Sequence, residues 1–344
     1  MKHRLKLWLR EAYARLLFHT GLHALVDRAM PRRLLILAGH CVTAPSNARL
    51  PKDMKIAGEK LERILGWLAL RYEVTTVGQA WRRLREPGRR SLVALSMDDG
   101  YRDNRSHLLP LLARVGVPAT VYLESAPLDE RRVNWSHKFF WILDRVGAAQ
   151  LASRLEQRCP DLAGKLGGAA TSYDQKRVLK YQAEPAARNR AIDALFAELG
   201  GDERALCDEL YMNWDDARGL RDAGLELGGH TRSHEILSRL DPAAALEEVR
   251  GGRESMRRGL GIESESFAYP FGRRWDYDAG SKAAARAAGY ASAATTHAGT
   301  NGAGTDPYEL KRVMIDADAR LHLLVAEACG GFDLLRKVGL DLSE

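Results

Sequence analysis

Two adjacent carboxylates at the end of a short apolar run are the first residues in this chain that could do chemistry. Residues 92–97 are almost wholly apolar, which predicts a strand buried on both faces, and Asp98, Asp99 and Gly100 follow directly. Side chains alternate along a strand, so neighbouring carboxylates can serve one pocket in two roles only where the strand ends and glycine lets the chain turn. Asp and Gly are also common in solvated turns, so this stretch alone leaves that alternative open.

Two histidines four residues apart follow another apolar run, residues 225–228. In a helical turn, His230 and His234 would point the same way about one turn apart, which is the spacing that a metal ion needs. The alternative is a polar helix start in which Thr231 or Ser233 is the cap.

A third candidate stretch, Phe-Ala-Tyr-Pro-Phe-Gly at residues 267–272, ends a predicted strand at 266–269. Pro270 lacks an N–H and fixes its own φ, so the amide of Phe271 is free and rigidly aimed. A fixed backbone donor at a strand end can hold a developing oxyanion. Tyr269, Pro270 and Phe271 are therefore candidates for holding the oxyanion or the substrate, although an aromatic strand closed by a turn would look the same in isolation.

The elements around these stretches alternate between strand and helix. Strands are predicted at 34–37, 74–77, 92–97, 118–123, 225–228, 266–269, 291–295 and 310–315, and helices from about residue 53 and at 79–85, 105–115, 215–223, 242–260, 281–288 and 319–329. This alternation predicts an α/β fold with a largely parallel sheet. The carboxyl ends of parallel strands share one face, so the three stretches are expected to meet there, together with His40 after the first strand.

If the three stretches meet, their polar groups complement one another. One Asp and two His supply three ligands for Zn²⁺ and leave a position open for water. Metal-bound water can have a pKa of roughly 7, and the second Asp can take its proton.

The three stretches resemble the motifs of the NodB-like polysaccharide deacetylases, carbohydrate esterase family 4. The first motif, usually Thr-Phe-Asp-Asp-Gly, reads Ser-Met-Asp-Asp-Gly at 96–100, and His-Ser/Thr-x-x-His is matched fully at 230–234. The third occurs at 267–272 in its Phe-x-Tyr-Pro-Phe-Gly variant. The resemblance runs from about residue 34 to 315. It implies a distorted (β/α) barrel and metal-dependent removal of N- or O-acyl groups from sugars.

The resemblance also implies a role for each matched residue. Asp98 corresponds to the general base, and the Phe271 amide to the oxyanion donor. Asp99, His230 and His234 correspond to the ligands of a divalent metal, for which Zn²⁺ is the first candidate.

The chain departs from the family pattern at two functional positions. The arginine that many members carry in motif three falls on Ala268, which leaves Arg312, entering the last strand, as a candidate to orient Asp98 or contact substrate. The Leu-x-x-His motif that supplies the catalytic acid is not found, and His297 and His322 are the available substitutes. His297 follows a predicted strand and is the better placed of the two.

The domain organisation predicted is a basic amphipathic N-terminal helix at 1–33 and a deacetylase barrel at 34–344. A mostly helical insertion at about 129–213 interrupts the barrel on its loop side. The Trp and Phe residues of the insertion recur at helical spacing, which favours core packing over a substrate groove.

The net charge of +7 is concentrated at the N-terminus. Residues 1–33 hold eight Lys or Arg against Glu11 and Asp27, so they carry +6 and the rest of the chain is near neutral. A nucleic-acid-binding protein needs a basic face on the fold itself, so we expect no nucleic-acid partner.

Residues 3–29 predict an amphipathic helix with Arg and Lys between apolar residues. It would either lie on an anionic membrane surface or pack on the domain with a solvated basic face. Its longest uncharged run, 16–26, is too short to span a bilayer, and no signal-peptide cleavage site follows. The expected location is the cytoplasm, with peripheral contact at the inner membrane face left open.

The function expected from the sequence is metal-dependent deacetylation of an N-acetylated sugar in a surface polysaccharide or its lipid-linked precursor. The alternatives are hydrolysis of another amide, such as an N-formyl group, and a sugar-binding pseudoenzyme. The presence of both carboxylates and both histidines argues against the pseudoenzyme.

Overall fold

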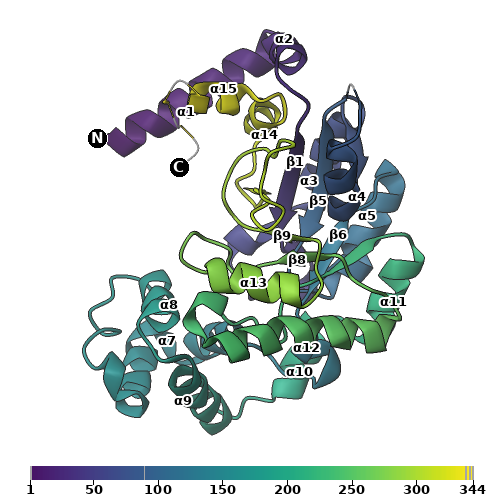
Figure 1. The fold of residues 1–344 in the computed structure, drawn as a ribbon. Helices are drawn as coiled ribbons and strands as arrows, with labels where there is room; N and C mark the ends of the chain where they lie inside the picture. The colour runs from purple at the N-terminus through teal and green to yellow at the C-terminus, as the bar shows by residue number, and fades with distance from the viewer. Residues whose placement is uncertain (1, 89, 338, 341, 343–344) are drawn as a thin grey trace.

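A computed structural model describes residues 2–88, 90–337, 339–340 and 342. At its centre lies an eight-stranded parallel sheet in the order β10-β1-β5-β6-β7-β8-β9, with β4 beside the first half of β5 (Figure 1). The strands are β1 (Leu34–Gly39), β4 (Glu73–Thr75), β5 (Leu92–Met97), β6 (Thr120–Leu123), β7 (Glu226–Gly229), β8 (Ser266–Ala268), β9 (Ser292–Ala294) and β10 (Val313–Met314). A parallel bridge between Ala294 and Leu310 joins β9 to the segment entering β10, so the sheet curls into a partial barrel. The predicted distorted (β/α) barrel is confirmed.

The two central strands are buried on both faces, as their apolar runs predict. β1 and β5 pair in register from Leu34 opposite Leu92 to Gly39 opposite Met97. Leu35 of β1 belongs to the core shared with the outer helices, whereas its neighbour Leu34 belongs to a core inside the curled sheet. This alternation is the two-residue period of a strand, so both faces of the sheet are covered.

Helices connect the strands and cover the sheet (Figure 1). They are α3 (Gly58–Ala69), α4 (Val77–Leu84), α5 (Leu109–Val115), α11 (Trp214–Asp222), α12 (Pro242–Leu260), α13 (Ala279–Ala287) and α14 (Leu321–Ala328). The predicted helix at 242–260 has the predicted bounds, because Asp241 caps it and Gly261, at φ 67°, ends it.

Several predicted boundaries were wrong. The helix expected from about residue 53 begins at Gly58, after a 3₁₀ turn (Lys52–Met54) and β3 (Lys55–Ile56), which pairs with β2 (Cys41–Val42). The strand expected at 74–77 ends earlier, because the Thr76 side chain accepts a hydrogen bond from the Gln79 amide and starts α4.

Two other helices also differ from the prediction. The helix expected at 105–115 opens with a π-helical turn, Asn104–Leu108, directly after the first motif. The C-terminal helix does not stop for good at Gly330, because α15 (Gly331–Lys337) follows it.

Residues between β6 and β7 fold as a helical unit with a core of its own. Its helices are α6 (Ser125–Asp129), α7 (Trp135–Arg158), α8 (Ser172–Tyr181), α9 (Pro185–Glu198) and α10 (Glu203–Leu210), with a 3₁₀ turn at Pro160–Leu162. Phe139 and Trp141 lie in this core, as the helical spacing predicted. Trp135 also packs against Phe271 of the third motif, so the aromatic cluster reaches the predicted site as well.

The N-terminal segment forms two helices, α1 (Lys2–His19) and α2 (Leu22–Ala29), where one was expected. Gly21, at φ 76°, breaks the helix between them. One face of α1 is buried against the last two helices through Ala14 and Leu17, whose partners include Phe332. The segment is thus packed on the domain.

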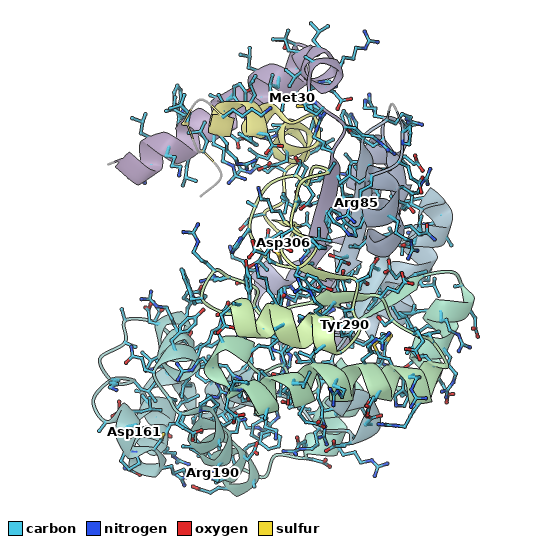
Figure 2. The ribbon with its side chains drawn as sticks, viewed as in Figure 1. Met30, Arg85, Asp161, Arg190, Tyr290 and Asp306 are labelled. Carbon is cyan, nitrogen blue, oxygen red and sulfur yellow. The ribbon has the colours of Figure 1, made fainter. Side chains whose placement is uncertain are left out.

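The N-terminal helices and the helical insertion lie at opposite ends of the molecule. In Figure 2, Met30 at the end of α2 and Asp161 in the insertion mark these two ends. In the described part of the chain, no helix combines the length and apolarity that crossing a membrane requires.

Candidate active site

The ends of β5 and β7 bring a carboxylate and two imidazoles together. Asp99, His230 and His234 are all buried, and each offers a ligand atom within 4.8 Å of the others. Asp99 Oδ1 lies 3.2 Å from His230 Nε2 and 3.3 Å from His234 Nε2. The three residues chosen from the sequence as metal ligands therefore form one cluster.

The donor atoms in this cluster fit a cation. His230 Nδ1 lies 2.7 Å from the Ala268 carbonyl oxygen, to which only an N–H can donate, so in the neutral ring Nε2 presents a lone pair to Asp99. Among the described residues, buried Asp99 Oδ1 has no hydrogen-bond partner. Electron-pair donors that face one another without a proton between them are what a divalent metal such as Zn²⁺ binds.

The predicted helical turn at His230–His234 was wrong. These residues form a loop, in which Thr231 and His234 have φ values of 64° and 59°. The Thr231 hydroxyl accepts a hydrogen bond from the His234 amide at 3.0 Å and stabilises the loop. A sequence spacing of four residues suits a helix, but left-handed residues in a loop can also turn two histidines toward one point.

Positive φ recurs across the three motifs. Asp99 and Phe271 have φ values of 73° and 62°, and Thr231 and His234 of the loop described above are also left-handed. Left-handed conformations cost a non-glycine residue about 1–3 kcal/mol each and persist where the surroundings enforce them. In the described chain, Arg131 is the one further non-glycine residue of this kind, so the strain is concentrated at the site.

Asp98 is held by an arginine that the sequence marked only as a candidate. Arg312 donates from Nη1 to Asp98 Oδ1 at 2.7 Å and from Nη2 to Oδ2 at 2.8 Å. Both side chains are buried, and Arg312 Nε is fixed by the Thr295 carbonyl at 2.8 Å. Arg312 thus orients Asp98. In this role Arg312 takes the place of the motif-three arginine, whose position is occupied by Ala268.

The two aspartates are kept ionised by their neighbours. Burial alone would raise the pKa of Asp98, but the positive charge of Arg312 outweighs it and lowers that pKa. Burial would likewise raise the pKa of Asp99, yet the positive charges that His234 and His230 carry when they are protonated hold it well below its usual value. A carboxylate with a low pKa is a metal ligand or a weak base, so Asp98 can accept a proton only from a strongly acidified donor.

Tyr101 and His137, which were not predicted from the sequence, form a hydrogen-bonded chain to Asp99. The Tyr101 hydroxyl donates to Asp99 Oδ2 at 2.7 Å and contacts His137 Nε2 at 2.8 Å. Burial lowers the pKa of His137 to about 3, so the ring is neutral and can donate to the Tyr101 oxygen. Tyr101 follows the first motif by one residue, but nothing in the sequence connects it to a histidine in the insertion.

In the third motif, Phe271 contacts the histidine cluster and Tyr269 packs in the core. Among the described residues, the Phe271 amide has no acceptor, while its ring lies edge-on to His234 with centroids 4.7 Å apart. Tyr269 is fully buried, donates to the Tyr308 carbonyl and stacks on Tyr277. The Tyr269 side chain thus belongs to the core beside the site, and buried Pro270 precedes the free Phe271 amide. The assignment of Tyr269 and Pro270 to oxyanion or substrate binding stays a prediction.

The three candidate histidines occupy different places. His40, at the end of β1, interacts electrostatically with both Asp98 and Asp99. His297, after β9, lies 5.8 Å from the Tyr277 ring, and its carbonyl accepts from the Arg312 amide. His322 contacts Glu11 of α1 at 2.8 Å, so it belongs to the packing of the N-terminal helix.

We expect His297→Ala to lower the maximal rate of deacetylation by about 10²-fold or more, the usual effect of losing a general acid. The reason is its place beside the segment that holds Arg312 and hence Asp98. Steady-state kinetics on His297→Ala and on the control His322→Ala test this. Small and equal effects would mean that water or His40 protonates the leaving amine.

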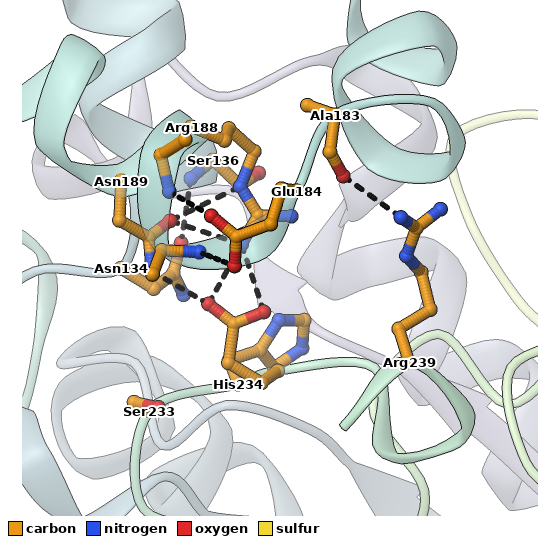
Figure 3. A network of polar contacts seen from close by, with 12 residues as sticks. Asn134, Ser136, Ala183, Glu184, Arg188, Asn189, Ser233, His234 and Arg239 are labelled. Atoms are coloured by element: carbon orange, nitrogen blue, oxygen red, sulfur yellow. Dashed lines mark hydrogen bonds and ion pairs between the residues drawn. The ribbon is translucent and has the colours of Figure 1, made fainter. Parts of the chain in front are cut away.

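The insertion is fastened to the loop that carries His234. Arg188 of α9 donates to both oxygens of Glu235, at 2.7 and 2.8 Å, and Asn189 donates to one of them at 2.8 Å. Figure 3 shows Arg188 and Asn189 near His234, with Arg239 bound to the Ala183 carbonyl. Helix α9, more than 40 residues away along the chain, thus helps to shape the loop that carries His234.

Comparisons with known proteins relate this fold and site to the polysaccharide deacetylases. Residues 183–293, which include the second and third motifs, match the sequence model of the polysaccharide deacetylases. The resemblance of the motifs to that family is confirmed. No curated protein sequence gives a significant match.

Several solved deacetylase structures have the same fold. The Streptococcus pyogenes deacetylase PplD is 15% identical, with a TM-score of 0.56 over 87% of this chain and 99% of that one. IcaB from Ammonifex degensii is 16% identical, with a TM-score of 0.55 over 87% and 98%. A de-N-acetylase from Aggregatibacter actinomycetemcomitans is 17% identical, with a TM-score of 0.54 over 85% and 98%. At these identities the likeness establishes the NodB-type fold, and the family match supports carbohydrate deacetylation.

Proposed function

We propose that this protein is a metal-dependent hydrolase that removes N-acetyl groups from a surface polysaccharide or its lipid-linked sugar precursor. The observation that carries the proposal is the cluster of Asp99, His230 and His234 with Asp98, oriented by Arg312, beside it. The match to polysaccharide deacetylases and the similar fold of a deacetylase described in complex with acetate support the same reaction class.

The chemistry follows from the positions of the chain's own groups. A divalent metal held by Asp99, His230 and His234 would supply an acidified water molecule and polarise the amide carbonyl. Asp98, fixed by Arg312, accepts the proton of the attacking water. The free amide of Phe271 donates to the oxygen that gains negative charge, and His297 returns a proton to the leaving amine.

Acetate release tests this proposal and separates it from the alternatives. We expect the full chain to release acetate from N-acetylglucosamine oligomers, to lose this activity on chelation and to regain it with Zn²⁺. Release of formate from an N-formyl sugar, but no acetate, would favour the alternative acyl group. Sugar binding without release of either acid in the metal-loaded protein would favour the pseudoenzyme and contradict the proposal.

We also propose that α1 contacts an anionic membrane surface, which would place the enzyme at the inner membrane face. Packing on the domain buries one face of α1 but leaves a second apolar stripe exposed, with Leu5 57% and Trp8 64% accessible. Exposed Arg4 and Arg15 flank this stripe. An apolar stripe with basic neighbours suits a bilayer of anionic lipid better than a second protein surface.

The double substitution Leu5→Gln and Trp8→Gln should weaken binding to phosphatidylglycerol vesicles by about tenfold or more, because two apolar side chains no longer enter the interface. Vesicle sedimentation measures this, with Leu70→Gln, at an exposed leucine beyond α3, as the control. Deleting the segment is a poorer test, because it would uncover Phe332 and its neighbours. Unchanged vesicle binding by the double variant would refute membrane contact, and loss of a dimer instead would assign the stripe to a second copy.

A further inference from the structure

One helix of the insertion places two lysines beside the candidate active site. Lys176 and Lys180 lie four residues apart on α8, so they share one face of the helix. The Lys180 ammonium lies 3.6 Å from the centroid of the Phe271 ring, which itself lies against His234. Lys176 interacts electrostatically with Asp99 and His234. Lys180 therefore borders the Asp99–His230–His234 cluster from the side of the third motif. Lys176, one turn earlier on the same face of α8, is near enough to Asp99 to interact with its charge.

The two lysines differ in how their charges are compensated. Lys180 is buried and forms an ion pair with buried Asp276 at 3.3 Å. Lys176 is partly buried and lies 4.4 Å from the centroid of the Phe140 ring. In the part of the chain that the structure describes, its ammonium has neither a hydrogen-bond acceptor nor an ion-pair partner. Burial lowers the pKa of Lys176 to about 8, and the charges of Asp53 and Asp99 only partly offset this.

The balance of charges around the cluster favours an anion. Arg312 neutralises Asp98, and Asp276 neutralises Lys180. A divalent metal bound to Asp99 would not be fully neutralised by that single carboxylate. The ammonium of Lys176 adds to the remaining positive charge. Partly desolvated positive charge without a partner is costly, and the cost falls when a negatively charged ligand enters. An N-acetyl group is neutral, so this negative charge must come from another part of the substrate.

We propose that Lys176, with Lys180 beside it, forms a subsite for a phosphate or carboxylate group on the N-acylated sugar, so that the enzyme prefers anionic over neutral substrates. This inference rests on the proposed function, which it narrows to sugars with an acidic substituent near the N-acetyl group. Lysine suits this role because it presents three donors that can rotate toward a phosphate or carboxylate.

Calorimetric binding to the full chain loaded with Zn²⁺ tests the subsite. The probes are N-acetylglucosamine 1-phosphate, N-acetylmuramic acid and, as the neutral reference, methyl N-acetylglucosaminide. We expect at least one acidic sugar to bind about tenfold or more tightly than the neutral one, the usual effect of a hydrogen bond to a charged group. The first two probes distinguish a phosphate from a carboxylate.

Lys176→Met should abolish this preference, and Lys176→Arg should retain most of it. Lys165→Met is the matched control, since Lys165 is an exposed lysine of the same insertion. Equal binding of acidic and neutral sugars by the wild type, or an unchanged preference in Lys176→Met, would overturn the subsite. Inorganic phosphate that binds as tightly as the sugar phosphate would also overturn it as a sugar subsite.

Acetate release, measured separately, keeps this inference distinct from the proposed function. Charge preference in binding without acetate release from any N-acetyl sugar would contradict the deacetylase and leave the anion subsite standing. Acetate release without charge preference would contradict the subsite alone.

Discussion

Replacing Asp98 by asparagine is expected to lower the rate of deacetylation by about 10²- to 10⁴-fold while the protein keeps its metal. The amide keeps the shape of the carboxylate but cannot accept a proton from water. Asp98 is not among the three residues whose ligand atoms converge, and both of its oxygens are occupied by Arg312. The loss should therefore fall on the maximal rate and leave the metal content per chain unchanged.

Arg312, the buried ion-pair partner of Asp98, makes Asp98→Asn affect stability as well as rate. Substituting Arg312 in addition provides the control. Asp98→Asn leaves the guanidinium of Arg312 without its counter-charge in a buried position, which typically costs about 3–5 kcal/mol of stability. The double variant Asp98→Asn, Arg312→Met removes that charge, so it should unfold at a higher temperature than Asp98→Asn. Recovery of stability without recovery of rate would assign the loss to chemistry. Recovery of both would show that Asp98 is needed only for folding.

The parts of the fold that depend on local pattern could be predicted from the sequence. Apolar runs such as residues 92–97 become buried strands wherever both faces of a parallel sheet are covered. Because parallel strands end at one face, the order of the motifs also predicted that Asp99 would meet His230 and His234. Neither step needs the identity of any distant partner.

Pairings between distant side chains could not be predicted in this way. Arg312 reaches Asp98 across 214 residues, and its hydrogen bonds depend on how β10 aligns with β1 and β1 with β5. Tyr101 and His137 meet only because the insertion folds back over the first motif. Hydrophobic periodicity does not encode such alignments. The sequence therefore identified Arg312 as a candidate, but only the structure shows that it binds Asp98.

The conformation of the histidine loop was beyond prediction for a different reason. A spacing of four residues is compatible with a helix and with a loop, and the choice here depends on left-handed residues at Thr231 and His234. Non-glycine residues adopt this conformation rarely, and only the packing around them enforces it. Contacts such as that of Arg188 with Glu235, directly after the loop, are part of that packing.

Asp99→Asn is expected to release the metal. Among the substitutions considered, it should reduce the metal affinity most. Asp99 Oδ1 is the oxygen that faces both imidazole nitrogens, and the anionic carboxylate is the one negative charge of the three-residue cluster. A neutral amide at this position is a poorer ligand. Loss of an outer partner of a metal ligand already costs 10- to 100-fold in affinity, so loss of the ligand charge should cost about 100-fold or more.

Competition with a chromogenic chelator, followed by metal analysis of the dialysed protein, measures this affinity. Tyr101→Phe removes the hydrogen bond to Asp99 Oδ2 but keeps both the carboxylate and the ring, so we expect a smaller loss of about tenfold. This graded series separates loss of the ligand from general damage to the pocket. If Asp99→Asn kept its metal while Asp98→Asn lost it, the roles of the two aspartates would be exchanged. If neither substitution changed the metal affinity or the rate, the cluster at the ends of β5 and β7 would bind no catalytic metal.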